Sequence, residues 1–176
     1  AGWCLTEPHC GSDAAALTTR AEKTDRGWVL NGQKLFITSA RRAAVVVVMA
    51  RTKPEGGKDG ISAFVVDAAT PGIDIGSPEE KLGLRASVTA AVSFSGCRVP
   101  SRQLLGTEGA GFKIALATLD HSRLGIAAQA VGMHQRALEL ATAYASERVQ
   151  FGKPIAAHQA IQFQLARMAT ELAAAR

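Results

Sequence analysis

The sequence predicts an α+β fold, with a small antiparallel β-barrel or sandwich domain at residues 1–105 and long antiparallel helices of a helical bundle at residues 106–176. Short apolar runs separated by turn residues recur through the first part, which is typical of β-strands. The composition changes near Leu105, and apolar residues then recur at helical steps of three and four. With 47% hydrophobic and 20% charged residues, the chain has the composition of a globular protein.

Each expected strand rests on a local pattern. Residues 31–32 are Asn-Gly, the dipeptide that favours a two-residue hairpin turn, so the segments on either side are expected to pair. Residues 45–50 form a continuous apolar run, which indicates a strand buried on both faces. Residues 88–95 alternate apolar and polar side chains, which indicates one solvent-facing side. The expected strands are residues 17–24, 28–30, 34–38, 45–50, 61–67 and 88–95, with a loop at 54–60 and turns at 25–27 and 70–72.

The C-terminal part predicts two helices. A loop at residues 106–111 leads into a first helix that ends near residues 148–151, before Gly152 and Pro154. A second helix is expected from about residue 157 to the end, and helices joined by so short a connection pack antiparallel. The apolar faces comprise Phe112, Leu116, Leu119, Leu124, Ala128, Val131, Leu138 and Ala141, then Ile161, Leu165, Met168 and Leu172. Two helices leave much apolar surface open, so further chain or a partner subunit is expected to cover it.

Charge and cysteine content exclude several classes of protein. The formal net charge is +5, but the basic residues are scattered and rarely interleaved with aromatics, so no nucleic-acid partner is expected. The positive charge is suited to attracting a polyphosphate. Cys4, Cys10 and Cys97 have no metal-type spacing and are odd in number, which indicates no metal site and a reducing compartment. No segment has a membrane-spanning or signal-peptide pattern, and both ends are expected to continue into a longer protein.

Residues 4–13, Cys-Leu-Thr-Glu-Pro-His-Cys-Gly-Ser-Asp, are the most informative stretch. Pro8 restricts the backbone, and Gly11 allows a ligand to approach closely. Ser12 and Asp13 hold a polar loop in shape, so the loop can offer N–H groups and hydroxyls to a flat polar ring or a phosphate. Taken alone, it also fits an ordinary surface loop, and a lone loop histidine such as His9 is more often a surface residue than a base.

The order Thr-Glu-Pro-x-x-Gly-Ser-Asp at residues 6–13 resembles the flavin-binding signature of acyl-CoA dehydrogenases. Four later segments match the same family in the same order: residues 31–38, 82–100, 119–123 and 147–161. The resemblance covers essentially the whole chain. It implies the flavin- and acyl-CoA-binding middle β domain, followed by the start of a C-terminal four-helix bundle.

The resemblance implies that FAD is the cofactor. Residues 3–6 would pass along the flavin, the Phe36 ring would pack on the isoalloxazine, and the Thr38 hydroxyl would bond near N5, the atom that receives hydride. The family often has Trp where this chain has Phe36, and small residues where it has His9 and Cys10. In the family, the equivalents of Arg148, Phe151 and Gln159 reach the FAD of a neighbouring subunit, which implies a homodimer or homotetramer. The implied FAD-binding residues are Trp3, Leu5, Thr6, Gly11, Ser12, Phe36, Ile37, Thr38, Arg148, Phe151, His158 and Gln159.

The resemblance also implies an acyl-CoA site. Ser12, Asp120, Ser122 and Arg123 would border the substrate, and an arginine suits phosphate or carbonyl recognition. Without the resemblance, residues 119–123 also read as a polar helix surface. A minority of the family carries its catalytic glutamate at the position of Ser122, which cannot act as the base. Asp120 lies on a different helix face. No catalytic residue is therefore expected in this chain, and the base is expected beyond residue 176.

The resulting hypothesis is an FAD-dependent α,β-dehydrogenation of an acyl-CoA thioester in fatty acid β-oxidation, with electrons passed to an electron-transfer flavoprotein. The bacterial cytoplasm is preferred over the mitochondrial matrix as its location. Three alternatives stay open: an oxidase or flavin monooxygenase of the same fold, a non-catalytic flavoprotein, and, more distantly, a nucleic-acid-binding module. The residues do not indicate the length or branching of the acyl chain.

Overall fold

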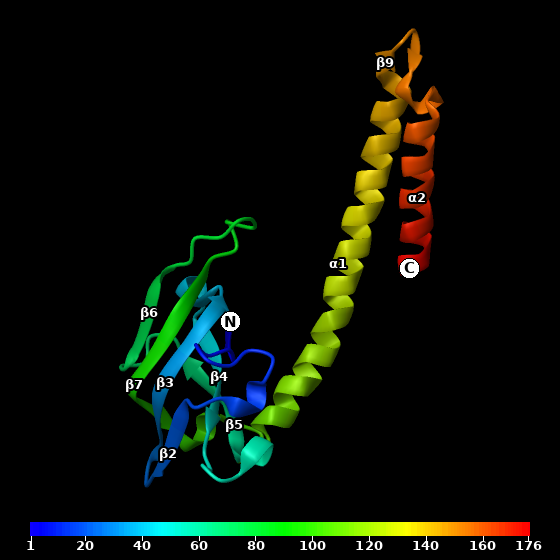
Figure 1. Cartoon of the computed structure of the whole chain (residues 1–176). Coiled ribbons are helices and arrows are strands. Elements are labelled where there is room, and N and C mark those ends of the chain that lie inside the picture. Colours follow the sequence, from blue (N-terminus) through cyan, green and yellow to red (C-terminus); the bar gives the residue numbers. More distant parts are fainter. The chain divides into compact units, whose positions relative to one another are not determined.

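The computed structural model describes residues 1–176, which divide into two compact units, Ala1–Ala117 and Thr118–Arg176. Figure 1 shows a β-sheet unit formed by the N-terminal part of the chain and a pair of helices formed by the C-terminal part. The predicted α+β class is confirmed. The division between residues 105 and 106, as a statement about domains, stays a prediction. Neither helix combines the length and hydropathy that a membrane span requires.

The first unit is built on one eight-stranded sheet, ordered β6-β7-β3-β2-β4-β5-β8, with β1 pairing in parallel with β4. Because β6 and β8 are free edges, the sheet is open and does not close into a barrel. The strands are β1 Gly2–Cys4, β2 Arg20–Thr24, β3 Gly27–Thr38, β4 Val45–Arg51, β5 Ile61–Asp67, β6 Ile73–Pro78, β7 Thr89–Pro100 and β8 Leu104–Leu105. Short 3-10 turns lie at Ala14–Ala16, Ala40–Arg42, Gly57–Gly60, Ser101–Gln103 and Ile155–Ala157.

The two faces of the sheet bury two apolar clusters. Strand β4 contributes to both because side chains alternate along a strand: Val46 and Val48 face one cluster, and Met49 faces the other. The larger cluster contains an edge-to-face contact between Trp28 and Phe64, with ring centroids 5.5 Å apart. The smaller cluster is completed by Ala115, near the start of the long helix. The prediction of a buried strand at residues 45–50 is confirmed.

The predicted hairpin at residues 31–32 is wrong. Strand β3 runs through this point, and the hairpin turn between β2 and β3 is the one predicted at residues 25–27, which is confirmed at residues 25–26. The Asn31 side-chain oxygen accepts a hydrogen bond from the Gly96 N–H at 2.7 Å, and the pairing of β3 with β7 shifts register here. Gly32 has φ +150°, and a Cβ on it would lie 2.5 Å from the Thr19 hydroxyl oxygen. The extra residue of this β-bulge lies in β7, where Ser95 and Gly96 together oppose Asn31 and Gly96 has φ +61°. The Asn-Gly pair therefore lies in the strand opposite the bulge and forms no turn.

Other strand predictions hold, with changes at the ends. Residues 61–67 form β5, and β7 buries Val92 and Phe94 while Ser95 is exposed, as the alternation predicted. The strand predicted at residues 17–24 begins only at Arg20. The edge strand β6 was not predicted.

The second unit contains most of helix α1, Gly111–Glu147, and all of α2, Gln159–Ala175. The connection contains two short paired strands, β9 Val149–Gln150 and β10 Lys153–Pro154, so the predicted break near Gly152 is confirmed. Ala145 and Leu172 are buried in this unit. The predicted face of α2 is confirmed because Ile161, Leu165 and Met168 are half-buried. Leu124 is 75% exposed, because α2 is too short to cover the whole apolar stripe of α1.

Candidate functional site

In the first unit, the segment after β1 lies along the second half of β3. The backbone N–H of Leu35 donates to the Thr6 carbonyl at 2.9 Å, and the ammonium of Lys34 donates to the Leu5 carbonyl at 3.2 Å. The structure thus brings together two groups of predicted site residues, 3–6 and 36–38, which are about 30 positions apart in the sequence.

A buried ion pair joins these two segments. The Lys34 Nζ atom lies 2.7 Å from Glu7 Oε1, and the two side chains are 0% and 1% exposed. A buried charge is costly unless it is paired and hydrogen-bonded, and each partner here meets that requirement.

The Glu7 carboxylate has further donors. Its Oε2 accepts hydrogen bonds from the Thr18 N–H at 2.7 Å and the Thr18 hydroxyl at 3.0 Å, and its Oε1 accepts from the Thr19 N–H at 3.0 Å. Burial alone raises the pKa of Glu7, but the charge of Lys34 and these hydrogen bonds outweigh it and lower the pKa to about 2. Glu7 is therefore an ionised structural anchor and not a proton acceptor at neutral pH.

For the other titratable groups nearby, the effect of burial on the pKa outweighs the effect of the neighbouring charges. Burial lowers the pKa of Lys34, although the attraction of Glu7 partly opposes this effect. Burial also raises the pKa of Cys4 to about 12, against a smaller lowering by Lys34, and it raises the pKa of Cys10. Both thiols are consequently protonated and inert at neutral pH.

Phe36 is displayed at a distortion of β3. Its φ is +56°, a left-handed conformation that is uncommon for a bulky residue, and the pairing with β7 shifts register between Lys34 and Ile37. The Phe36 side chain is 61% exposed, Ile37 is buried, and Thr38 is exposed. Phe36 lies in the bulge, and Thr38, two residues later, pairs in register with Thr89, so this end of β3 exposes an aromatic ring and a hydroxyl.

The loop that follows Glu7 is compact at its base. Glu7 and Cys10 form an isolated antiparallel bridge with backbone hydrogen bonds in both directions, and the predicted residues Gly11 and Ser12 are exposed beyond it. Glu7, His9 and Cys10 offer potential metal-ligand atoms within 4.8 Å of one another. Both Glu7 oxygens already accept hydrogen bonds, and Lys34 balances its charge, so the arrangement does not favour a cation.

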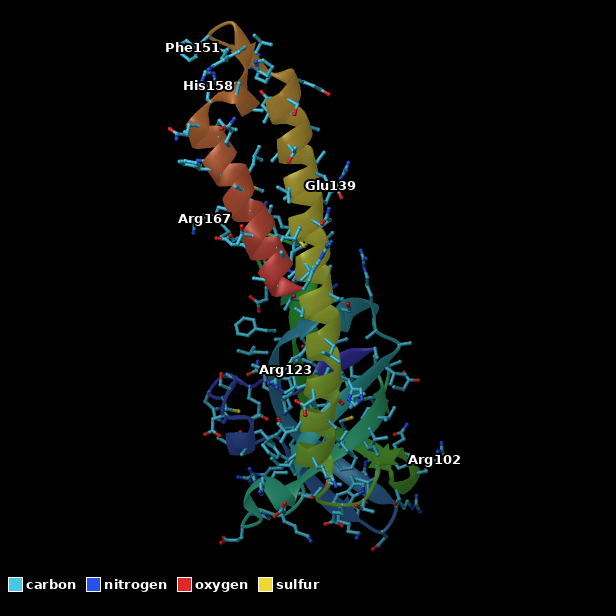
Figure 2. The ribbon with its side chains drawn as sticks, turned by 90° about the vertical axis from the view of Figure 1, so that its right-hand side faces the viewer. Arg102, Arg123, Glu139, Phe151, His158 and Arg167 are labelled. Carbon is cyan, nitrogen blue, oxygen red and sulfur yellow. The ribbon has the colours of Figure 1, made fainter.

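In the second unit, the predicted substrate residues lie on α1 and are exposed. Arg123 Nη1 lies 3.2 Å from Asp120 Oδ1, one helical turn away, and Figure 2 shows Arg123 on this helix. The Ser122 hydroxyl donates to the Leu119 carbonyl at 3.0 Å. Asp120 and Arg123 therefore form one exposed polar pair, whereas Ser122 bonds back to its own helix.

The remaining predicted residues gather at the turn between α1 and α2 (Figure 2). Phe151 is 93% exposed at φ +53°, and its ring meets the His158 ring edge-to-face at 5.8 Å. His158 Nε2 lies 3.4 Å from the Gln150 carbonyl, and Arg148 and Gln159, which flank this segment in the sequence, are exposed. Phe151, like Phe36, is thus an exposed aromatic residue at a strained backbone position.

Glu7 and Lys34 were not assigned a role from the sequence. A signal was present, because the period-two pattern of Trp28 and Leu30 also places Lys34 on the core-facing side of the strand. A lysine at such a position requires a buried anion, and Glu7 lies within the motif that was already singled out.

The site in the first unit is chemically suited to a flat aromatic ring with polar edges. An exposed aromatic side chain, Phe36, lies beside the hydroxyl-bearing Thr38, and the Thr6 segment runs alongside. These groups offer a stacking face and hydrogen-bonding atoms at its rim, which is the donor set that a flavin requires. The fold and site thus define a β domain that presents an exposed aromatic ring and hydroxyl groups at one end of β3.

Comparison with known proteins gives the family. Residues 2–97 match the family described as acyl-CoA dehydrogenase, middle domain, and residues 109–176 match acyl-CoA dehydrogenase, C-terminal domain. The chain belongs to the acyl-CoA dehydrogenase family. It is 52% identical over 174 residues to an acyl-CoA dehydrogenase of Bacillus subtilis, a match that covers 99% of this chain and 46% of the relative.

Comparison with solved structures points to the same family. The butyryl-CoA dehydrogenase of Megasphaera elsdenii superposes with a TM-score of 0.95 at 44% identity, covering 98% of this chain and 45% of that one. A chain in a structure of the electron transferring flavoprotein of Acidaminococcus fermentans gives a TM-score of 0.95 at 46% identity, covering 98% of this chain and 46% of that one. The chain therefore spans about half the length of the relatives that it matches.

Proposed function

We propose that the protein carrying this chain is an FAD-dependent oxidoreductase that dehydrogenates an acyl-CoA thioester between its α and β carbons. The observation that carries the proposal is Phe36, an exposed ring held at a strained backbone position beside Thr38 and the Thr6 segment. Membership of the acyl-CoA dehydrogenase family supports the reaction class.

When bound, FAD supplies the acceptor for the hydride that leaves the β carbon. Phe36 and Trp3 provide apolar contact for the ring, and the hydroxyls of Thr6, Thr38 and Ser12 provide hydrogen bonds that orient the cofactor. Leu5, Gly11 and Ile37 contribute the backbone around them. We assign Arg148, Phe151, His158 and Gln159, at the turn of the helical unit, to the FAD of a neighbouring subunit of a homodimer or homotetramer.

Substrate binding is assigned to Ser12, Asp120, Ser122 and Arg123. Arg123 and Asp120 pair with each other while both remain exposed, so the guanidinium keeps donors for a phosphate or carbonyl oxygen. Loss of the α-proton requires a base within hydrogen-bond reach. Ser122 is not basic and bonds to Leu119, so we place the base in sequence beyond residue 176.

The electrons are proposed to pass to an electron-transfer flavoprotein, which the chain that matches in the Acidaminococcus fermentans structure supports. Fatty acid β-oxidation in the bacterial cytoplasm is the proposed setting. The three free, buried cysteines fit a reducing compartment.

The test is anaerobic mixing of the full-length protein with a panel of acyl-CoA thioesters while the flavin absorbance is followed. Bleaching by thioesters of one chain length, followed by reoxidation with electron-transfer flavoprotein, is the expected result and identifies the substrate. Bleaching followed by rapid reoxidation with oxygen would instead support an oxidase or monooxygenase. A flavin that stays oxidised with every thioester would contradict dehydrogenation and support a non-catalytic flavoprotein.

A further inference from the structure

We propose that the Glu7 carboxylate, held by Lys34, is a positioning element that sets the relative placement of the three segments assigned to FAD in the first unit. The inference rests on the proposed function, because it concerns the same cofactor. Glu7 and Lys34 are positioning residues that act through the segments they join, and neither is assigned a contact with the cofactor.

The first junction is between the Thr6 segment and β3. Three successive residues, 5, 6 and 7, each accept one hydrogen bond from Lys34 or Leu35. Two of these bonds come from the Lys34 ammonium, at 3.2 Å to the Leu5 carbonyl and 2.7 Å to Glu7 Oε1. The placement of Thr6 relative to Thr38 therefore depends in part on one buried side chain, that of Lys34, beside the backbone bond from Leu35 and the pairing of β1 with β4.

The second junction closes the loop that carries Gly11 and Ser12. Glu7 stands at the start of this loop, and its carboxylate accepts hydrogen bonds from the backbone N–H groups of Thr18 and Thr19 at the end of it. The same carboxylate therefore ties both ends of the loop to β3. Removing its charge weakens its bonds to β3, through Lys34, and to the end of the loop, through Thr18 and Thr19, because bonds to an ionised acceptor are roughly twice as strong as neutral ones.

The third junction is the bulge that displays Phe36. The register shift begins at Lys34, so the anchored lysine is the last regular position before the strained residue. Strained backbone persists where the surroundings over-determine it, and the fully buried Lys34 provides such a constraint two residues away. Binding groups must be held to within a fraction of an ångström to be effective, which is the task that we assign to this pair.

The experiment separates a positioning role from a purely structural one with a double-mutant cycle in the full-length protein. The variants are Glu7→Gln, Lys34→Met and the pair together. Each single variant leaves a buried group without its partner, whereas the double variant removes both charges, so stability is expected to recover partly in the double variant. Stability is read from urea unfolding, and cofactor placement is read from the FAD dissociation constant of the apoprotein and the visible circular dichroism of bound FAD.

The expected result is that the double variant binds FAD at least tenfold more weakly than the wild type and with an altered dichroism spectrum, even where its stability has recovered. The matched control is Lys23→Met with Glu108→Gln, an exposed lysine–glutamate pair in the same unit at 3.4 Å. This control is expected to leave FAD affinity and the spectrum unchanged.

A double variant that is folded, with wild-type FAD affinity and spectrum, would overturn the inference and leave the proposed function intact. If the double variant does not fold, Glu7→Gln alone decides. Its amide cannot accept from all of the donors that surround it, so unaltered FAD binding by that folded variant would equally contradict positioning. A wild-type protein that binds no FAD would overturn the proposed function, and the inference with it.

Discussion

Lys34 and Glu7 approach to 2.7 Å inside the first unit, and neither side chain has appreciable access to water. Each group is stabilised in its charged form by the other, and removal of either leaves a buried charge without a partner. The pair is therefore a point at which changes of pH and sequence should have large, measurable effects.

The first prediction concerns the stability of the first unit at acidic pH. The folded-state pKa of Glu7 is lowered from 4.5 to about 2, so the pair contributes stability that is fully present above about pH 5 and is lost as the pH falls toward and through 2. The contribution is on the order of 3 kcal/mol, since one pKa unit corresponds to about 1.4 kcal/mol. Both tryptophans of residues 1–176, Trp3 and Trp28, lie in the first unit, so their fluorescence during urea unfolding reports on this unit.

The control for this prediction is the double variant Glu7→Gln with Lys34→Met. Its unfolding free energy is expected to change less between pH 6 and 3 than that of the wild type, because the titrating carboxylate is absent. Equal losses in the two proteins would show that other carboxylates cause the acid sensitivity.

The second prediction concerns Gly27, at the start of β3. Gly27 has φ +142°, and a Cβ there would lie 2.9 Å from Pro100 Cα, closer than real Cβ contacts come. Gly27→Ala should therefore destabilise the first unit by about 3 kcal/mol, because backbone atoms must move apart. Gly83→Ala, where no atom lies within 4 Å, is the matched control and should leave the urea midpoint unchanged.

The third prediction separates stability from binding at Phe36. Glycine adopts φ +56° without the steric cost that a β-carbon brings, so Phe36→Gly should stabilise the FAD-free protein by up to about 1 kcal/mol. The same change removes the ring assigned to the flavin and should weaken FAD binding at least tenfold. Phe36→Ala should weaken binding similarly without the gain in stability. Unchanged FAD affinity in both variants would contradict the role given to this ring.

The sequence predicted those features that local patterns determine. The apolar run at residues 45–50 and the break at Gly152 each depend on neighbours in the chain, and both were found. The Asn31-Gly32 prediction was wrong because the partners that decide its conformation, Gly96 and Thr19, are remote in sequence. Local propensity permitted a turn, but pairing with β7 keeps Asn31 and Gly32 within a continuous strand, opposite a bulge in β7.

The features of the site divide in the same way, into those that local patterns predict and those that depend on residues remote in the sequence. The loop and strand motifs were visible as residue patterns, and the structure places residues 3–6 beside residues 36–38. The ion pair spans 27 positions, and no local pattern links a glutamate in a loop to a lysine in a strand. The strain at Phe36 depends on the register between β3 and β7, which single-sequence patterns do not specify.

The fourth prediction concerns thiol reactivity. Burial raises the pKa of Cys4 to about 12 and also raises the pKa of Cys97 and Cys10, so the thiolate fraction at neutral pH is very small. Ellman's reagent should modify none of these three in the native protein within minutes, and all three after unfolding in guanidinium. Cys10, at 7% exposure, should react first if the loop opens, and rapid native reaction of Cys4 would contradict the burial described here.

The fifth prediction concerns the catalytic base. Asp120 is exposed and pairs with Arg123 at 3.2 Å, an interaction worth about 0.5 kcal/mol or less, so Asp120→Asn should barely alter stability. If the base lies beyond residue 176, this variant of the full-length protein should retain the rapid bleaching of its flavin by substrate, with any change confined to substrate affinity.

The matched change is Ser122→Ala, which removes only a hydroxyl bonded to Leu119. The measurement is stopped-flow flavin absorbance under anaerobic, saturating substrate, because it isolates the chemical step. A fall of a thousandfold or more in that rate with Asp120→Asn, at unchanged FAD content, would place the base on α1 and contradict the assignment.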